Sequence, residues 1–337
     1  MLNFSDIWKK YPDLVYHIWD YFTDKSIHTN SDIDFSMFGS IGNFVIKSSI
    51  DFVETFYNKY SSDDGSFIGY NTVVKICNKL CEHGFLSKVV YGILNLDESS
   101  NYYYGWKNSG KSEQLLARFN DNKNIISYIF NSLVYGFKYI YEYNKRNVLP
   151  LYVKKGDSQY IGTCFKTVHG LVTAKHCISK TGSIKIAGMN KDVFTDCNIL
   201  TKDNLDIAVI QPNIEYQKEE YLLTGDGYVL DEIMVMGYPN HCGFDNFVTA
   251  TKGSIAAIEE SFLTKYDLML LTSKLKGGNS GGPVFNEEGY VVGIITETPN
   301  PEGEGYDQFG YGLAMPQYYI EEIVKSGKQI DEKINFE

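Results

Sequence analysis

The 337-residue sequence predicts an α+β protein, with a mostly helical N-terminal part and a strand-rich C-terminal part. Apolar residues recur at helical spacing as far as about residue 147. Pro150 then interrupts this pattern, and short apolar runs separated by glycines follow it. We therefore expect two domains, residues 1–147 and residues 148–337, each long enough to bury a core.

The helical part has a recognisable order of elements. Gly84 closes the third predicted helix, and Gly-Phe-Leu leads from it into two short predicted strands. This helix followed by a hairpin resembles a winged helix-turn-helix. The predicted helices are residues 4–22, 41–60, 70–83 and 124–143, and the predicted strands are residues 87–94 and 101–106.

The most informative motif is GGNSGGP at residues 277–283. A serine hydroxyl is a poor nucleophile at neutral pH, so acyl transfer by Ser280 needs an imidazole base and backbone N–H groups that hold an oxyanion. The glycines around Ser280 let the amides turn inward and let a substrate approach. His176, in TAKHC, offers the base, and Asp206, in LDIAVI, lies at the mouth of an apolar strand, where it could orient the imidazole.

Each of these residues also has a simpler interpretation. A histidine beside a cysteine is more often a packed core residue, an acid at a strand edge usually caps a turn, and a glycine-rich string can be only a hairpin. Together, in the order His176, Asp206, Ser280 and with these flanking residues, they favour an assembled catalytic triad.

The motifs resemble those of the trypsin-like (chymotrypsin-fold) serine peptidases from about Leu151 to Gln317. The triad spacings of 30 and 74 residues are closer to the compact bacterial Deg-type and glutamyl-endopeptidase branches. The resemblance implies a double β-barrel and a serine endopeptidase that forms an acyl-enzyme. It makes His176 the acid and base, Asp206 the orienting carboxylate, Ser280 the nucleophile, and the N–H groups of Gly278 and Ser280 the oxyanion hole.

Asn279 departs from the zymogens of this family, which carry an aspartate there that pairs with a newly cut N-terminus. Asparagine cannot form that ion pair, so activation by N-terminal trimming is not expected. The family also implies no cofactor, and the absence of a paired His or Cys cluster in the sequence predicts no metal site.

Substrate preference depends on Lys274, which the resemblance places at the base of the S1 pocket. A buried ammonium needs an anion, which suggests Asp or Glu at P1. Glu297 could instead pair with Lys274 and leave an apolar or small-residue pocket, and a third possibility puts Lys274 on a solvated loop. The remaining predicted pocket residues are Ile294, Ile295, Thr296, Gly312 and Ala314.

Charge bears on the partners of the N-terminal domain. Residues 1–148 carry 15 Lys and Arg against 16 Asp and Glu, and the remainder carries 16 against 26. A DNA-recognition module normally shows a basic excess. We therefore expect a protein substrate and a regulatory or sensor protein as partners, no membrane and no nucleic acid. The rival hypotheses are a winged-helix DNA-binding regulator and an inactive peptidase scaffold.

The cellular setting is expected to be the cytoplasm, because MLNFSD lacks the basic start and apolar run of an export signal. Thiols should then be reduced. Secreted trypsin relatives bridge the cysteine beside the histidine to one upstream, which Cys164 and Cys177 could imitate. The combination of domains resembles bacterial defence and stress effectors, in which the accessory domain controls the protease.

Overall fold

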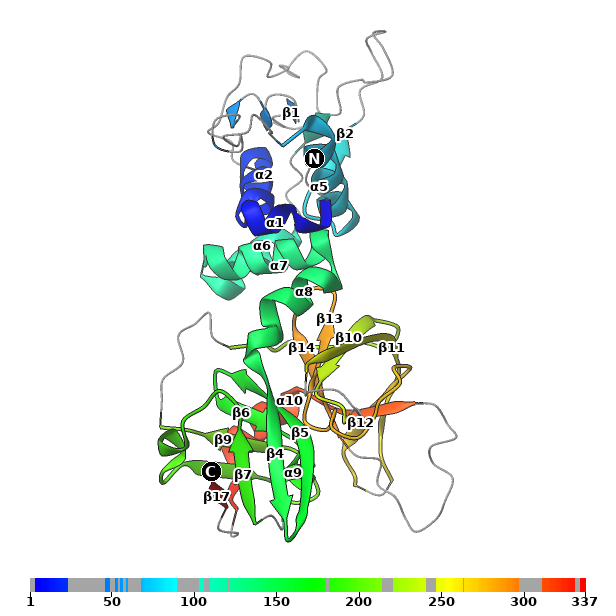
Figure 1. Ribbon diagram of the computed structural model, residues 1–337. Helices are drawn as coiled ribbons and strands as arrows, with labels where there is room; N and C mark the ends of the chain where they lie inside the picture. Colours follow the sequence, from blue (N-terminus) through cyan, green and yellow to red (C-terminus); the bar gives the residue numbers. More distant parts are fainter. Residues whose placement is uncertain are drawn as a thin grey trace. The chain divides into compact units, whose positions relative to one another are not determined.

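The computed structural model divides the chain into two compact units, residues 1–139 and 140–337 (Figure 1). Helices predominate in the first unit and strands in the second, so the predicted α+β class is confirmed. The domain boundary expected from the sequence, between residues 147 and 148, stays a prediction. The structure describes residues 4–23, 46–48, 52–53, 55–56, 59, 68–89, 103–105, 110–120, 122–179, 182–213, 221–240, 247–262, 264–296, 311–330 and 334–337.

The first predicted helix, residues 4–22, is interrupted. Tyr11 has φ −130° and ψ 73°, outside the helical region, because the proline that follows disfavours a helical backbone at the residue before it. This break separates α2 (Leu14–Thr23) from α1 (Ile7–Lys10), which directly follows η1 (Phe4–Asp6).

The third predicted helix agrees with α5 (Tyr70–Glu82). Gly84 has φ +79°, which glycine adopts without strain, and the N–H groups of Phe85 and Leu86 both return to the carbonyl of Leu80. The ring of Phe85 packs 4.9 Å from that of Phe130, so the end of α5 is fixed by the core of this unit.

Three short strands form an antiparallel sheet in this unit. They are β1 (Ile46–Ser48), β2 (Ser87–Val89) and β3 (Tyr103–Gly105), in the order β1-β3-β2. β1 lies inside the helix predicted over residues 41–60, so that prediction is wrong there. Its backbone pairs with β3 along the full length of both strands, and this long-range pairing overrides the local helical pattern. The rest of the predicted strands, residues 90–94, 101–102 and 106, lies outside the described residues.

The last predicted helix of this part, residues 124–143, is two helices, α7 (Lys123–Tyr135) and α8 (Phe137–Asn144). Gly136 separates them with φ +67°, which a continuous helix cannot contain. A further helix, α6 (Gly110–Phe119), was not predicted. No helix in the described part of the chain is long and apolar enough to cross a membrane.

The first sheet of the second unit has eight strands in the order β16-β8-β9-β6-β5-β4-β7-β17. It begins at Val148, directly after η3 (Lys145–Asn147). Pro150 lies within this strand because the pairing of β4 with β7 starts only at the next residue. The strands are β4 (Val148–Lys155), β5 (Ser158–Thr167), β6 (Gly170–Thr173), β7 (Ser183–Ile186), β8 (Asn198–Thr201), β9 (Ala208–Gln211), β16 (Lys328–Gln329) and β17 (Asn335–Phe336).

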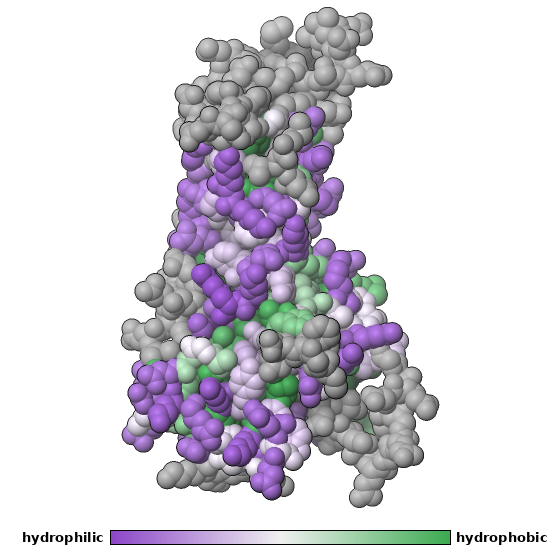
Figure 2. All heavy atoms as spheres, viewed as in Figure 1, coloured by the Kyte–Doolittle hydropathy of each residue, from purple (hydrophilic) through white to green (hydrophobic). Residues whose placement is uncertain are grey.

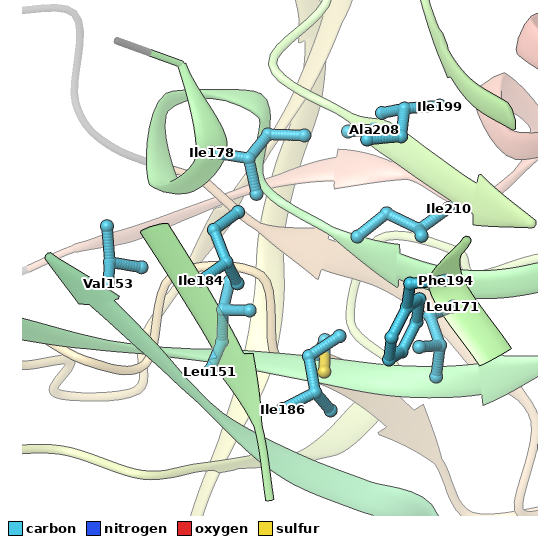
Figure 3. Packing of buried hydrophobic residues seen from close by; sticks show 11 residues of the cluster. Leu151, Val153, Leu171, Ile178, Ile184, Ile186, Phe194, Ile199, Ala208 and Ile210 are labelled. Atoms are coloured by element: carbon cyan, nitrogen blue, oxygen red, sulfur yellow. The ribbon is translucent and has the colours of Figure 1, made fainter. Parts of the chain in front are cut away.

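Buried aliphatic side chains fill the interior of this sheet (Figure 3). Leu151 from β4, Leu171 from β6 and Ile210 from β9 are all fully buried. Packing therefore fixes β6, which leads to residue 176, and its neighbour β9, which follows residue 206. The two residues are held by rigid strands.

The second sheet closes into a barrel in the order β10-β11-β12-β15-β14-β13. α10 (Tyr318–Ser326) follows the barrel. On the face in Figure 2, hydrophilic side chains cover much of the described surface, with hydrophobic atoms visible between them. The barrel strands are β10 (Glu232–Gly237), β11 (Thr249–Glu260), β12 (Asp267–Leu271), β13 (Pro283–Asn286), β14 (Val291–Ile295) and β15 (Gly312–Pro316).

Candidate active site

His176 and Asp206 meet beside two neighbouring strands of the first sheet, just after one strand ends and just before the other begins. β6 runs into the short helix α9 (Lys175–Ile178), which carries His176, and Asp206 lies two residues before β9, the neighbour of β6. One carboxylate oxygen of Asp206 accepts the backbone N–H of His176 at 2.8 Å, and the other lies 2.7 Å from Nδ1 of the ring. The carboxylate therefore fixes both the backbone and the ring of His176.

A third donor reaches the same carboxylate. Thr296, directly after β14, donates its hydroxyl to Oδ2 of Asp206. Burial acts to raise the pKa of Asp206, but hydrogen bonds from His176 and Thr296, with the charge of His176, bring the pKa below its ordinary value. Asp206 is therefore an anion at neutral pH. The sequence predicts Thr296 in the wall of the substrate pocket, whereas its hydroxyl bonds to Asp206.

The outer nitrogen of His176 lies beside a thiol. Nε2 is 3.6 Å from Sγ of Cys177, and the same sulfur is 3.9 Å from the carbonyl oxygen of Ser280. Burial acts to lower the pKa of His176, but the hydrogen bonds with Asp206 and Cys177 and the charges of those two groups raise the pKa above its ordinary value. The ring is thus a stronger base than a free imidazole.

The loop that carries Ser280 depends on its glycines. Gly278 has φ +100° and Gly281 has φ +82°, both in the region that side chains avoid. A Cβ on Gly278 would lie 2.3 Å from the carbonyl oxygen of Tyr238, and one on Gly281 would lie 2.2 Å from that of Thr163. Glycine at both positions is therefore a steric requirement of this loop.

Two N–H groups of this loop are available to a ligand. The peptide before Gly278 has its carbonyl, that of Gly277, held by the N–H of Asn240 at 2.9 Å. Within the described residues, no backbone carbonyl accepts from the N–H of Gly278 or of Ser280. Asn279 between them is buried, with an exposed fraction of 3%. The loop can therefore offer two backbone donors to an oxyanion.

The predicted pocket residues are only partly brought together. Lys274 is exposed, while Leu275 is half-buried and lies against Gly312, where a Cβ would come 2.4 Å from its Cδ1 atom. Ala314 is buried on the same strand, β15, beside the buried Ile294 and Ile295 of β14. Glu297 lies outside the described residues. The exposure of Lys274 agrees with the solvated-loop alternative.

No disulfide joins the cysteines among the described residues. Cys164 is fully buried on β5, and burial raises the pKa of its thiol well above the ordinary range. The residue that faces Cys177 is Gly162, where a Cβ would lie 3.0 Å from the sulfur. The described residues also contain no cluster of His, Cys, Asp and Glu able to hold a metal ion.

Two residues that contact the Ser280 loop were missed as site residues. Thr163 donates its hydroxyl to the carbonyl of Gly278 at 2.7 Å and accepts the N–H of Tyr238 at 2.9 Å. Thr163 lies in the string GTCF and Tyr238 in MGYP, and such short strings do not reveal a hydrogen bond between segments 75 residues apart.

Residues 162–294 match the family described as trypsin-like peptidase domain, so this segment of the chain is similar to trypsin-like peptidases. Its curated relatives include proteins named "Serine protease HtrA-like" from Staphylococcus aureus strains RF122 / ET3-1 and USA300, each 28% identical over 189 residues. The match covers 52% of this chain and 22% of those proteins, so the chain matches about a fifth of their length.

Similar solved structures include an HtrA-type protease, AlgW with tripeptide, and the serine endoprotease from Yersinia pestis. The first has a TM-score of 0.44 and 22% identity, covering 56% of this chain and 62% of that one. The second has a TM-score of 0.41 and 22% identity, covering 55% and 64%.

Proposed function

We propose that this protein is a serine endopeptidase that hydrolyses peptide bonds through an acyl-enzyme on Ser280. The observation that carries the proposal is the contact of His176 with Asp206, by backbone N–H at 2.8 Å and by Nδ1 at 2.7 Å, next to a glycine-shaped serine loop. A ring held by a carboxylate on one nitrogen presents the other nitrogen as the base.

Each step then has a named group. His176 Nε2 takes the proton of Ser280 Oγ as that oxygen attacks the peptide carbonyl, and later delivers it to the leaving amine. Asp206 stabilises the imidazolium that forms between these steps. The N–H groups of Gly278 and Ser280 hold the oxyanion, and water, activated by the same imidazole, releases the acyl group.

Labelling with a fluorophosphonate probe tests this chemistry. Wild type should label, and Ser280→Ala and His176→Ala should not. The matched controls are Ser254→Ala and His169→Ala, which replace residues outside the site and should label as wild type does. A wild-type chain that does not label under any activating condition would support the alternative of an inactive scaffold.

We propose that the substrates are proteins with an apolar or small P1 residue. Leu275 lies against Gly312 while Lys274 is exposed, so the apolar side chain is the one turned toward the predicted pocket. A positional-scanning peptide library compared among wild type, Lys274→Ala and Leu275→Ala tests this. Loss of a preference for Asp or Glu in Lys274→Ala alone would instead support the acidic pocket.

We propose further that the N-terminal unit controls the peptidase and binds a protein in a bacterial defence or stress response. The order α5, β2, β3, with β1 paired to β3, agrees with a winged helix. Its basic residues favour protein over DNA, since Lys79 pairs with Glu82 at 2.6 Å and Lys75 lies 5.7 Å from the ring of Phe4. The cytoplasmic location stays a prediction.

Comparing the full chain with residues 140–337 tests this control, because those residues form a compact unit. We expect different rates of fluorophosphonate labelling, and equal rates would remove the regulatory proposal. A gel-shift assay at moderate salt tests the DNA-binding alternative.

A further inference from the structure

We infer that Thr163 and Tyr238 are positioning residues for the oxyanion loop, and that Tyr238 ties this loop to the segment through which the chain enters the peptidase unit. The inference rests on the proposed function, because it concerns how the N–H of Gly278 is held ready. Neither side chain belongs to the proposed triad, and both act through the backbone of other residues.

The direction of the Gly278 N–H is set by the peptide it belongs to. That peptide is shared with the carbonyl of Gly277, which accepts from the N–H of Asn240 at 2.9 Å. Carbonyl and N–H point in opposite directions in a trans peptide. As long as Asn240 holds the carbonyl, the N–H of Gly278 is turned away from it and remains a donor. If this peptide rotated, a carbonyl would take the place of the donor.

Thr163 holds the next peptide of the loop. Its hydroxyl donates to the carbonyl of Gly278 at 2.7 Å, and its backbone N–H donates to the carbonyl of Ser280 at 2.9 Å. Thr163 is fully buried on β5, in the first sheet, whereas the loop belongs to the second barrel. One residue of the first sheet therefore fixes the loop on both sides of Asn279.

The hydroxyl of Thr163 has a second partner, which brings in Tyr238. It accepts the backbone N–H of Tyr238 at 2.9 Å, two residues before Asn240. A hydroxyl that donates to one segment and accepts from another fixes their spacing, so the Tyr238 segment and the Gly278 segment are joined by one oxygen atom. In this buried position, loss of the oxygen leaves a carbonyl and an N–H without partners.

Tyr238 also reaches the start of the peptidase unit. Its hydroxyl donates to the carbonyl of Val148 at 3.1 Å, and burial raises its pKa to about 12, so the hydroxyl stays a donor. Tyr141, in the last part of α8, donates to the carbonyl of Val248 at 3.2 Å. Residues 141–148 are therefore bonded to both ends of the stretch 238–248. Displacement of that entry segment acts on the oxyanion loop through Tyr238 and Thr163.

Side-chain variants of the full-length chain test this arrangement, with the rate of fluorophosphonate labelling as the readout. Thr163→Val keeps the shape and removes the hydroxyl. Because loss of one oxyanion donor costs about 100- to 1,000-fold, and this donor is misdirected and not deleted, we expect labelling to slow about 10- to 100-fold. Thr163→Ser keeps the hydroxyl and should restore the rate to within about threefold. Tyr238→Phe removes a single hydrogen bond and should slow labelling about 2- to 10-fold.

Matched controls separate positioning from general destabilisation. Thr167→Val makes the same change on the same strand, because Thr167 is buried and donates its hydroxyl to the carbonyl of Gly170 at 2.9 Å. Tyr160→Phe alters an exposed tyrosine of β5. Both should label at the wild-type rate. The low-field proton resonance of the His176–Asp206 pair should be the same in Thr163→Val as in wild type, which would show that the base is still assembled.

The possible outcomes are distinct. Slow labelling by Thr163→Val and Tyr238→Phe, with rescue by Thr163→Ser and an unchanged low-field resonance, supports the inference. If Thr163→Val and Tyr238→Phe both label as fast as wild type, the inference is overturned while the proposed function stands. A wild type that never labels removes both. Should Thr163→Val fail to fold, Tyr238→Phe decides the question.

Discussion

Thr296 donates its hydroxyl to the same carboxylate oxygen of Asp206 that lies 2.7 Å from Nδ1 of His176. The orienting carboxylate is therefore held from two sides, by the ring from the first sheet and by the hydroxyl that follows β14 of the second barrel. Asp206 and Thr296, which make this contact, are 90 positions apart in the sequence.

Thr296→Val should slow labelling about tenfold, because one hydrogen bond to a charged group is worth about 1.5 kcal/mol or more. Without this donor the pKa of Asp206 rises and the ring is less firmly oriented. Thr296→Ser should label nearly as fast as wild type. Equal rates for Thr296→Val and wild type would mean that His176 alone holds the carboxylate.

Cys177→Ala should shift the pH dependence of labelling. The thiol contributes to the raised pKa of His176, so its removal lowers that pKa. Labelling requires the neutral ring and rises as pH increases through the pKa of His176, so the acidic limb should move to lower pH. A Cys197→Ala variant, altering a cysteine of the same unit outside the site, is the control. An unmoved or more alkaline limb would contradict the assignment.

Gly162→Cys should form a disulfide with Cys177 under mild oxidation. A Cβ at residue 162 lies 3.6 Å from the Cβ of Cys177, within the range of natural disulfides. Closing a loop of this length should raise the free energy of unfolding by about 3 kcal/mol, measured by thermal unfolding with and without reductant. The same bond should consume the thiol near His176. Gly182→Cys, elsewhere in the unit, should form no bond with Cys177.

Gly278→Ala and Gly277→Ala form a matched pair of neighbouring substitutions. At Gly278 the added Cβ meets the carbonyl of Tyr238 at 2.3 Å and the backbone has φ +100°, whereas nothing lies within 4 Å at Gly277. We expect Gly278→Ala to slow labelling about 100-fold or more through loss of an oxyanion donor. Gly277→Ala should have the same free energy of unfolding and the same labelling rate as wild type. Similar behaviour of the two variants would show that the loop has another conformation in solution.

The sequence offered candidates for those parts of the site that depend on residue type and order. His176, Asp206 and Ser280 could be selected because acyl transfer needs those chemical groups, and flanking glycines and apolar runs supported them. The α+β class followed from periodicity, which is a local property.

Features that depend on long-range contact could not be read in the same way. The role of Thr163 requires knowing that β5 lies against the Ser280 loop, and strand β1 requires its pairing with β3. Local sequence also misjudged the break at Gly136, because a glycine inside an apolar helical pattern can be tolerated or can separate two helices. Whether Cys164 pairs with Cys177 was left open by the sequence, and Gly162 is the residue that faces the sulfur of Cys177.

The order in which the strands are made has a consequence for synthesis. β8 and β7 are shielded by the two short strands β16 and β17, which pair with them and are made after the second barrel. A nascent chain therefore exposes the longer strands β8 and β7 as sheet edges throughout translation of the second barrel, and open edges are sites of intermolecular pairing. Truncation before residue 328 leaves β8 and β7 exposed in this way, so the solubility of such truncated chains should fall well before any residue of the site is lost.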